Sequence, residues 1–405
     1  MNGLADGIAS GIWLTAARLR AYSLILLALA LLALGALAAT SNGLNDYQGR
    51  PLGTDFSNVY AAGKYVLDGK PEAPFNPPLQ HKKEQEIFGE KTPFYGWHYP
   101  PIFLFLAAAL ASLPYLAALT IWQAATLALY LVSIRSILPR TETWLPALAF
   151  PAVFINIAHG HNGFLTAALI GGGLWLLERK PVAAGILFGL LIYKPQFGVL
   201  IPLALLAGGY WRAFASASIT VIALCAAAYL AFGMGVWEAF RESMTFTREV
   251  VLEQGQTGFQ KIQSVFAAVR LLGGPVGLAY AAQAITFAVA AFCLIRIWRS
   301  PAAFALKASA LIAASMLATP YLLDYDLMIV APAIAFLVAH GLAKGFARYE
   351  KSVLAFVFLA PLLTRAIAEQ IFVPLGLIAL IALFAITLRR AGLDRRAAPA
   401  TLPAR

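Results

Sequence analysis

Long, nearly uninterrupted apolar runs decide what this chain can fold into. Of its 405 residues, 60% are hydrophobic and only 12% are charged, about half the charged share of an average soluble protein. An α-helix needs about 20 mostly apolar residues to cross a bilayer, so the chain has room for roughly ten to twelve crossings. The sequence therefore predicts an all-α polytopic membrane protein with a single integral membrane domain over residues 1–405. A water-soluble enzyme is excluded.

Twelve spans can be placed along the chain, and several of them are too short for a full crossing. Short spans predict broken or tilted helices around an internal cavity. The apolar segment Pro100–Leu113 has only 14 residues and begins with two prolines, so it is predicted to lie in the outer interface and not to cross. The predicted spans are Tyr22–Thr40, Leu116–Ile134, Leu145–Ala158, Gly163–Leu177, Val182–Tyr193, Phe197–Gly209, Ala213–Phe232, Val276–Ile295, Ala302–Thr319, Leu327–Ala343, Ser352–Ala366 and Ile371–Leu388.

The basic residues indicate the orientation of these spans. The net charge is +11, but the Lys and Arg residues fall in the gaps between apolar runs and form no block interleaved with aromatics, so nucleic acid is not an expected partner. With the N-terminus in the cytoplasm, every short cytoplasmic gap obeys the positive-inside rule. The predicted cytoplasmic residues are Arg135, Arg140, Arg179, Lys180, Arg212, Arg296, Arg299, Lys344, Arg348 and Lys351, followed by a basic tail over residues 389–405.

Most chemically capable side chains then lie on the opposite, outer face. Two larger loops are predicted there: a first outer loop over residues 41–115, with interfacial helices, and a second over residues 233–274. Nucleotides are absent outside the cytoplasm, so an enzyme on that face must take activated groups from a lipid carrier. We therefore expect a multi-pass protein of the cytoplasmic (inner) membrane whose site lies on the periplasmic or extracytoplasmic face.

Asp55 opens an amphipathic stretch of the first outer loop, in which Tyr60 and other aromatics fall near helical spacing. One interpretation is that Asp55 only caps this helix, because Asp is favoured at helix N-termini. The other is that Asp55 is a general base held at the bilayer surface, where it takes the proton of an acceptor hydroxyl. Further along, His98 and Tyr99 precede the interfacial segment, and an aromatic there suits the membrane belt as well as a substrate.

Lys194 lies between two apolar half-spans, where a lysine is costly unless it is paired, hydrated or functional. Pro195 ends the preceding helix and can expose backbone groups to a cavity. Together with Gln196, the Lys194 ammonium suits an anionic phosphate head group. The alternative is that the lysine side chain reaches the outer surface.

Two other outer connections carry polar groups. His161 and Asn162 lie in the turn IAHGHNGFL and could bind a substrate phosphate or form a plain polar turn. No cysteine or close carboxylate completes a metal-ligand set there at a recognisable spacing, so no metal and no other cofactor are predicted. Asp324 and Asp326, in ATPYLLDYDLM, could bind a divalent ion, hold a basic side chain such as Lys194, or contribute only loop polarity.

Taken in order, these motifs resemble glycosyltransferase family 87, the polyprenyl-phosphate-mannose-dependent α-mannosyltransferases of the C-type superfamily of integral membrane transferases. The resemblance covers about residues 20–345. One departure is His161, where the family pattern leads us to expect glutamine. The matching motifs are Asp55 followed by Tyr60-Ala61-Ala62, then Tyr99-Pro100-Pro101, Gly160-His161-Asn162, Lys194-Pro195-Gln196, and Thr319-Pro320-Tyr321 followed by Asp324-Tyr325-Asp326.

The resemblance implies a C-type glycosyltransferase fold with about 12 transmembrane helices. It also implies that a sugar, mannose in this family, moves from a polyprenyl-phosphate donor to a hydroxyl of a glycolipid or glycan acceptor, by inversion, with Asp55 as the base and without an obligatory metal. Membrane lipids are the other expected partners. The residues expected to contact the donor phosphate or substrate are Lys194, Gln196, His98, Tyr99, His161, Asn162, Tyr60, Asp324 and Asp326.

A transporter or flippase of a polyprenyl-linked or other lipid is the alternative from another functional class. A dozen spans with half-helices also describe many carriers, but these have inverted repeats and ionisable residues near the bilayer midplane. Here the ionisable residues gather on the predicted outer face, which favours the transferase. The sequence leaves open which sugar is transferred.

Overall fold

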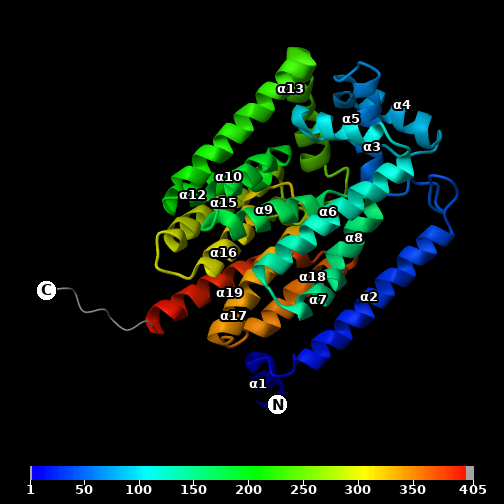
Figure 1. The fold of residues 1–405 in the computed structure, drawn as a ribbon. Coiled ribbons are helices and arrows are strands. Elements are labelled where there is room, and N and C mark those ends of the chain that lie inside the picture. Colours follow the sequence, from blue (N-terminus) through cyan, green and yellow to red (C-terminus); the bar gives the residue numbers. More distant parts are fainter. Residues whose placement is uncertain (1, 398–405) are drawn as a thin grey trace.

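Helices form nearly all of the regular structure, as the apolar runs predict. The computed structural model describes residues 2–397, which contain no β-strand (Figure 1). The α-helices are α1 (Asn2–Ser10), α2 (Ala16–Ala39), α3 (Thr54–Leu67), α4 (Pro77–Phe88), α5 (Leu104–Ala111), α6 (Tyr115–Ile137), α7 (Trp144–Ala149), α8 (Pro151–His159), α9 (Gly163–Leu177), α10 (Pro181–Leu190), α11 (Pro195–Gly198), α12 (Ile201–Ala207), α13 (Trp211–Phe246), α14 (Val265–Leu271), α15 (Val276–Trp298), α16 (Phe304–Ala318), α17 (Val330–Lys344), α18 (Glu350–Ile371) and α19 (Leu375–Ala397). The shorter helices are η1 (Ala73–Phe75), η2 (Pro101–Phe103), η3 (Thr141–Thr143), η4 (Leu191–Tyr193), η5 (Thr247–Glu253), η6 (Phe259–Lys261) and η7 (Asp324–Ile329).

Seven helical segments are long and apolar enough to cross a membrane. All twelve predicted spans coincide with helical structure, but five of them are shorter than a full crossing. The chain is therefore a multi-pass membrane protein, and the count of about twelve crossings stays a prediction. The seven segments are Ala16–Ala39, Tyr115–Ile137, Trp211–Glu253, Val276–Trp298, Asp324–Lys344, Glu350–Ile371 and Leu375–Arg396.

Some predicted spans are interrupted. The span expected over Leu145–Ala158 is two helices, α7 and α8, because Phe150 is extended (φ −60°, ψ 122°) before Pro151, and a residue before proline disfavours helical angles. Likewise, the span expected over Phe197–Gly209 is the pair α11 and α12. Here the prediction that short spans are broken helices is confirmed.

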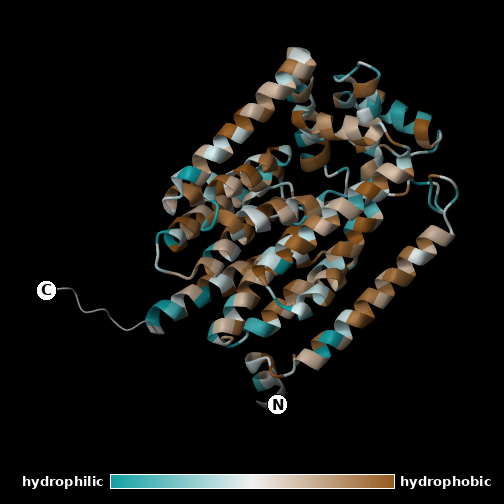
Figure 2. Ribbon diagram, viewed as in Figure 1, coloured by the Kyte–Doolittle hydropathy of each residue, from teal (hydrophilic) through white to brown (hydrophobic). Residues whose placement is uncertain are grey.

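The core is built around α16, which is the helix most enclosed by its neighbours. Twelve of its 15 residues are buried, most of them Ala, Ser or Leu. Small residues let helix backbones approach closely in a membrane, and α16 packs against α15, α17 and α19. By contrast, α2 lies along one edge of the bundle, and only 6% of the residues in its apolar stretch are buried. This leaves a hydrophobic surface for lipid (Figures 1 and 2).

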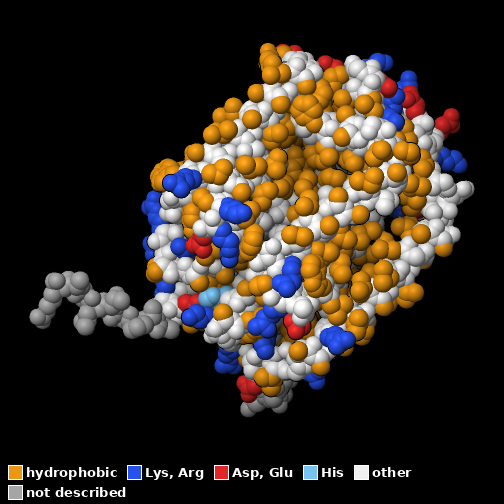
Figure 3. All heavy atoms as spheres, in the orientation of Figure 1, with side chains coloured by type: hydrophobic (Ala, Val, Ile, Leu, Met, Phe, Trp, Pro, Cys, Tyr) orange, Lys and Arg blue, Asp and Glu red, His pale blue; other side chains and the backbone are white. Residues whose placement is uncertain are grey.

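The surface separates into an apolar face and two polar ends. Figure 3 shows hydrophobic side chains over most of the visible face, with Lys and Arg near the chain termini and again at the opposite end, around α4. At the end with the termini, Arg390 forms buried ion pairs with Glu350 (2.7 Å) and Asp394 (2.8 Å). Residues 389–397 of the predicted basic tail are thus the last turns of α19, and residues 398–405 lie outside the described residues.

Residues 41–115, the predicted first outer loop, contain α3, α4 and α5 and lie at the end of the molecule opposite the termini (Figure 1). The segment Pro100–Leu113 contains only η2 and the eight-residue α5, about 12 Å of helix at 1.5 Å per residue, which is too short to cross. In the second outer loop, α13 continues past residue 233 to Phe246. Its kink lies at Gly233, whose backbone (φ 80°, ψ 179°) is outside the helical region.

A glycine sets the distance between α3 and α5. A methyl group at Gly63 would collide with the backbone carbonyl of Ala107 and come within 2.6 Å of Ala111 Cβ. We predict that Gly63→Ala lowers the free energy of unfolding by about 1–3 kcal/mol, the usual cost of overpacking, as measured by thermal unfolding in detergent. Gly35→Ala in α2 is the control, because its methyl would have no neighbour within 4 Å. Equal melting temperatures for Gly63→Ala and the parent protein would contradict this packing.

Candidate active site

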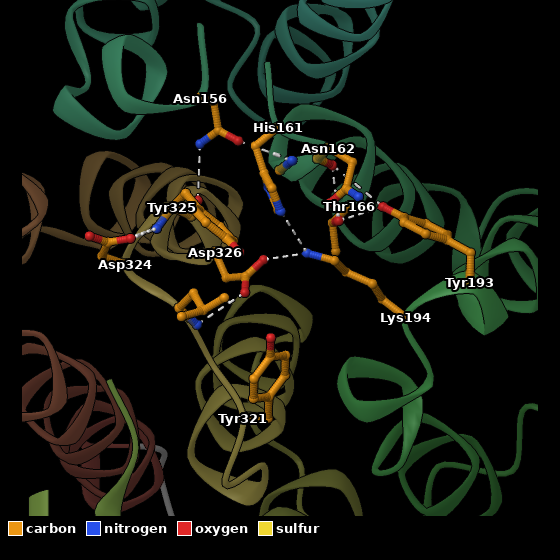
Figure 4. A network of polar contacts seen from close by, with 12 residues as sticks. Asn156, His161, Asn162, Thr166, Tyr193, Lys194, Tyr321, Asp324, Tyr325 and Asp326 are labelled. Carbon is orange, nitrogen blue, oxygen red and sulfur yellow. Dashed lines mark hydrogen bonds and ion pairs between the residues drawn. The ribbon is translucent and has the colours of Figure 1, made fainter. Parts of the chain in front are cut away.

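Polar side chains from distant parts of the chain meet inside the bundle (Figure 4). The turn between α8 and α9 supplies His161 and Asn162, the break between η4 and α11 supplies Lys194, and η7 supplies Asp326. All four residues are buried. A buried polar group is stable only with hydrogen-bond partners, so the contacts of each one indicate what the site can bind.

Lys194 and Asp326 form an ion pair, with the Nζ atom 2.7 Å from Oδ1 and the side chains 7% and 2% exposed. The second carboxylate oxygen of Asp326 accepts a hydrogen bond from the Leu323 backbone N–H at 3.1 Å. Among the interpretations of Asp326, the structure thus supports the one in which it holds Lys194. The alternative that Lys194 reaches the outer surface is wrong, because its side chain is enclosed.

His161 extends this ion pair. Its Nε2 atom lies 3.4 Å from Lys194 Nζ, and an ammonium can only donate, which assigns the ring proton to Nδ1. That buried Nδ1 has no partner among residues 2–397. The ring itself stacks on Tyr325, with centroids 3.6 Å apart. His161 therefore keeps an unused hydrogen-bond donor inside the site.

Asn162 links the turn to the first outer loop. Its Nδ2 donates to the Tyr99 hydroxyl at 2.7 Å, and its backbone carbonyl accepts from the Thr166 hydroxyl at 3.1 Å. The Oδ1 atom is buried and lacks a partner within the described chain. Burial, followed by the charge of Asp55, raises the pKa of Tyr99 well above its ordinary value, so Tyr99 stays a neutral hydroxyl. Tyr99 and Asn162 therefore lie in one site with Asp55.

Asp55 is the second residue of α3, and the residue that caps this helix is Gly53, with φ 69° in the left-handed region. The interpretation of Asp55 as the N-cap is therefore wrong. Its Oδ2 atom is buried, and no described residue pairs with it. Burial raises the pKa of Asp55 above the usual carboxyl range, which brings a carboxylate closer to the basicity that a general base needs.

The charges around Asp55 show what surrounds it. Interaction with His159 opposes the increase in the Asp55 pKa, the negative charge of Asp324 adds to it, and Lys194 and Lys261 oppose it. His159 is fixed by a 2.7 Å contact between its Nδ1 and the Thr54 hydroxyl. The pKa of Asp55 is therefore influenced by side chains that the sequence places in four different connections.

Asp324 points away from Asp326 (Figure 4) and has its own cation. Arg365 Nε of α18 lies 2.6 Å from Asp324 Oδ2, a partner that the sequence analysis missed. The two carboxylates thus bind different cations and do not converge. Within the described part of the chain, no group of three or more His, Cys, Asp or Glu side chains is placed to hold a metal ion.

Three predicted site residues, His98, Tyr60 and Gln196, lie outside this hydrogen-bond network. His98 makes a 2.8 Å hydrogen bond with the Thr247 hydroxyl, and burial lowers its pKa to about 4, so it is uncharged near neutral pH. The Tyr60 hydroxyl donates to the Leu113 carbonyl at 2.8 Å, which fastens α3 to the end of α5. Gln196 is half-buried, and no hydrogen bond joins its side chain to the described residues.

Several polar residues of the network gave no signal in the sequence because they lie within apolar runs. Asn156 of α8 accepts from the Gly163 backbone N–H at 3.0 Å and donates to the Tyr325 carbonyl at 3.0 Å. In this way it holds the α8–α9 turn against η7. Thr166 and Tyr193 share a buried hydrogen bond behind Asn162. The only hint in the sequence was that each of them is a single polar residue in a predicted span. Such a residue is costly in a membrane unless it has a role.

The fold and these contacts define a multi-pass membrane protein with a buried polar site that contains the Lys194–Asp326 ion pair and several unpaired hydrogen-bonding atoms. The model of glycosyltransferase family 87 matches residues 97–320, more than half of the chain, so the chain belongs to this family and is a membrane glycosyltransferase. The family membership expected from the motifs is thereby confirmed. A comparison with curated proteins found no match, and a comparison with solved structures found none either.

The Lys194–Asp326 pair makes a prediction about stability. Removing one partner of a buried ion pair leaves the other charge uncompensated, which costs about 3–5 kcal/mol. We therefore expect Lys194→Met to lower the free energy of unfolding by this amount, and the double variant Lys194→Met/Asp326→Leu to recover most of it. Thermal and chemical unfolding in detergent measure both. If the double variant is as unstable as the single variant, the lost stability does not come from an uncompensated Asp326 charge.

Proposed function

We propose that this glycosyltransferase moves a sugar from a polyprenyl-phosphate donor to a hydroxyl of a glycolipid or glycan acceptor at the outer face of the cytoplasmic membrane, with Asp55 as the general base. The observation that carries the proposal is the unpaired, buried Oδ2 of Asp55, and the influence of Lys194 and Lys261 on the Asp55 pKa supports it. Mannose is the proposed sugar on the strength of the family resemblance. Family membership also favours a transferase over a transporter or flippase.

The chemistry requires a base and a site for a departing phosphate. In a single inverting displacement, the acceptor oxygen attacks the anomeric carbon, its proton passes to Asp55, and the bond to the carrier phosphate breaks. Negative charge then grows on the phosphate, so donors and cations placed there stabilise the transition state more than the ground state. This assignment puts the acceptor on the Asp55 side and the phosphate among the cations.

Lys194 remains the first candidate for the phosphate contact, and its hydrogen bonds indicate which of its donors is available. An ammonium has three donors, and Asp326 and His161 take two of them at 2.7 and 3.4 Å. The third is left for a phosphate oxygen, next to the free Nδ1 donor of His161. Lys261 and Arg365 are further cations on this side, both half-buried. His98, being neutral, would contribute a hydrogen bond and no charge.

The proposal includes a C-type glycosyltransferase fold and an arrangement in the membrane. The first outer loop, 41–115, carries the base on α3, and the second outer loop, 233–274, contributes Lys261. Both loops would face the periplasm or exterior, and the end with the chain termini would face the cytoplasm. The distribution of basic residues supports this orientation.

The substrate class can be tested by native mass spectrometry of the detergent-purified protein with polyprenyl phosphate, polyprenyl-phosphate mannose or a nucleotide sugar. We expect retention of both polyprenyl species and none of the nucleotide sugar. Retention of the nucleotide sugar alone would overturn the proposed donor. Polyprenyl-phosphate mannose is then the donor for turnover assays against glycolipid acceptors.

Asp55→Asn is predicted to lower turnover by about 10²–10⁴-fold, the usual contribution of general-base catalysis, because an amide cannot take the acceptor proton. Donor binding, followed by native mass spectrometry, should change little. Asp68→Asn is the matched control, since Asp68 ends the same helix, is exposed and pairs only with Lys83 at 3.2 Å. Near-normal turnover in Asp55→Asn would remove Asp55 from the base role.

The orientation predicts the labelling of single cysteines. Cys225 and Cys293 are both free, and replacing them with alanine gives a background without thiols. A membrane-impermeant maleimide should then label Lys70→Cys in intact cells, and Arg179→Cys only after permeabilisation, because both positions are exposed but lie on opposite predicted faces. The reverse pattern would invert the topology and with it the face proposed for the reaction.

A further inference from the structure

Helix α4 holds the segment that leads from residue 90 into Tyr99. Three of its side chains bind backbone groups of this segment: His81, and Glu84 and Gln85, which follow it by three and four residues. Gln85 Nε2 donates to the Glu90 carbonyl at 2.8 Å, His81 Nε2 contacts the Thr92 carbonyl at 2.9 Å, and a Glu84 oxygen accepts from the Tyr95 backbone N–H at 3.0 Å. The path of residues 90–95 is therefore set by α4.

Glu84 is fully buried, although α4 is a polar helix at the end of the molecule. Beside it, Gln80 Nε2 donates to the Asn58 backbone carbonyl at 3.0 Å and contacts Glu84 Oε1 at 3.4 Å. Asn58 lies on α3, three residues after Asp55, so the two residues share one side of that helix. Hydrogen bonds thus link the helix that carries Asp55, through α4, to Tyr95.

This cluster contains more acceptors than donors. Asn58 Oδ1 and Gln80 Oε1 are both buried and find no partner within residues 2–397. A buried polar atom without a partner costs free energy, and the protonated form of Glu84 supplies the kind of donor that these atoms lack. In agreement, burial raises the pKa of Glu84 to about 8.

Tyr95 is the last residue in the series of hydrogen bonds that runs from Asn58 through Gln80 and Glu84. It is half-buried, and its hydroxyl forms no hydrogen bond with the described residues. The pKa of Tyr95 is raised to about 12, first by burial and then by the negative charge of Asp55. The Tyr95 hydroxyl is therefore neutral, has no hydrogen-bond partner among the described residues, and is influenced by the charge of the proposed base.

We propose that the Tyr95 hydroxyl hydrogen-bonds the hydroxyl-bearing acceptor beside Asp55, and that protonated Glu84 is the positioning residue that holds Tyr95 there. The inference rests on the proposed function, because the role of Asp55 defines where the acceptor lies. Tyr95 orients the acceptor oxygen for attack and takes no part in bond making. Glu84 acts only through the backbone of Tyr95 and through its contact with Gln80.

The protonation of Glu84 predicts how acceptor binding depends on pH. Below pH 8 the neutral acid is the main form, and as the pH rises through about 8 the site gains a second buried carboxylate. Desolvation and the negative charge of Asp55 both disfavour that state, so acceptor binding should weaken as the pH rises from 7 to 9. The charged and titratable groups that interact with Glu84 or Tyr95 are Asp46, Arg50, Asp55 and Tyr115.

The test compares steady-state kinetics with polyprenyl-phosphate mannose and a glycolipid acceptor. Tyr95→Phe removes only the hydroxyl, and we expect the KM for the acceptor to rise about tenfold, the effect of one hydrogen bond, while the KM for the donor stays within about twofold. Tyr47→Phe is the matched control, because Tyr47 is an exposed tyrosine of the same outer loop. An unchanged acceptor KM in Tyr95→Phe would overturn the role of Tyr95.

Glu84 is tested by a pair of variants. Glu84→Leu should raise the acceptor KM about as much as Tyr95→Phe, and Glu84→Gln should restore most of the loss, because glutamine can still accept from the Tyr95 N–H but cannot ionise. The fall in kcat/KM for the acceptor between pH 7 and 9 should be lost in Glu84→Gln and kept in the control Glu86→Gln, an exposed acid of the same helix. A fall of the same size in Glu84→Gln would overturn the role of Glu84.

Two failures can be told apart. If the parent protein transfers no sugar, or Asp55→Asn keeps its turnover, the proposed function fails. If Asp55→Asn is inactive but Tyr95→Phe binds the acceptor as well as the parent does, only the present inference fails. Should Glu84→Leu not fold, Tyr95→Phe and the pH profile of Glu84→Gln still decide the matter.

Discussion

The ion pair between Lys194 and Asp326 is the interaction on which the rest of the site depends. It joins residues 132 positions apart in the sequence and brings together the break after η4 and the start of η7. Neither charge is tolerable alone in an apolar bundle, so each residue requires the other. His161 rests on the pair, and Asn156 ties its turn to the Tyr325 backbone. Among residues 2–397, in contrast, Asp55 Oδ2 has no hydrogen-bond partner, which is consistent with its proposed role as a base.

The sequence predicted the membrane class and the approximate place of the long apolar helices, because hydropathy is a property of consecutive residues. It also offered Lys194 as a partner for Asp326, since a charge buried in an apolar run demands one. Partners across helices were harder to foresee, because spacing along the chain says nothing about which helices are neighbours. Arg365 is an example, as its contact with Asp324 depends on how α18 packs. The cap of α3 was missed because Gly53 relies on a left-handed backbone and needs no side-chain acceptor.

The site divides into two environments that suit the two ends of the proposed reaction. Toward the bundle interior, Lys194 and His161 present donors among apolar helices, where electrostatic interactions are strong. Toward the first outer loop, Tyr95 and the polar face of α4 surround the approach to Asp55 with neutral hydrogen-bonding groups. A phosphate needs the first environment, and a hydroxyl-bearing acceptor needs the second. The proposed mechanism places Asp55 where they meet, with its carboxylate toward the acceptor and the cations toward the leaving group.

Two carboxyl groups near this junction show how neighbouring charges can give two desolvated acids different roles. Glu84 is surrounded by uncharged amides, and its pKa rises to about 8, so it is mainly a neutral acid near pH 7. Asp55 is desolvated too, but His159, Lys194 and Lys261 lower its pKa in part, which favours the ionised form that a base requires. A buried polar atom that stays unpaired costs about 1–3 kcal/mol on general grounds. In the proposed mechanism a substrate pairs with the free atoms of Asp55, His161 and Asn162, so these atoms contribute to the selection of the ligand.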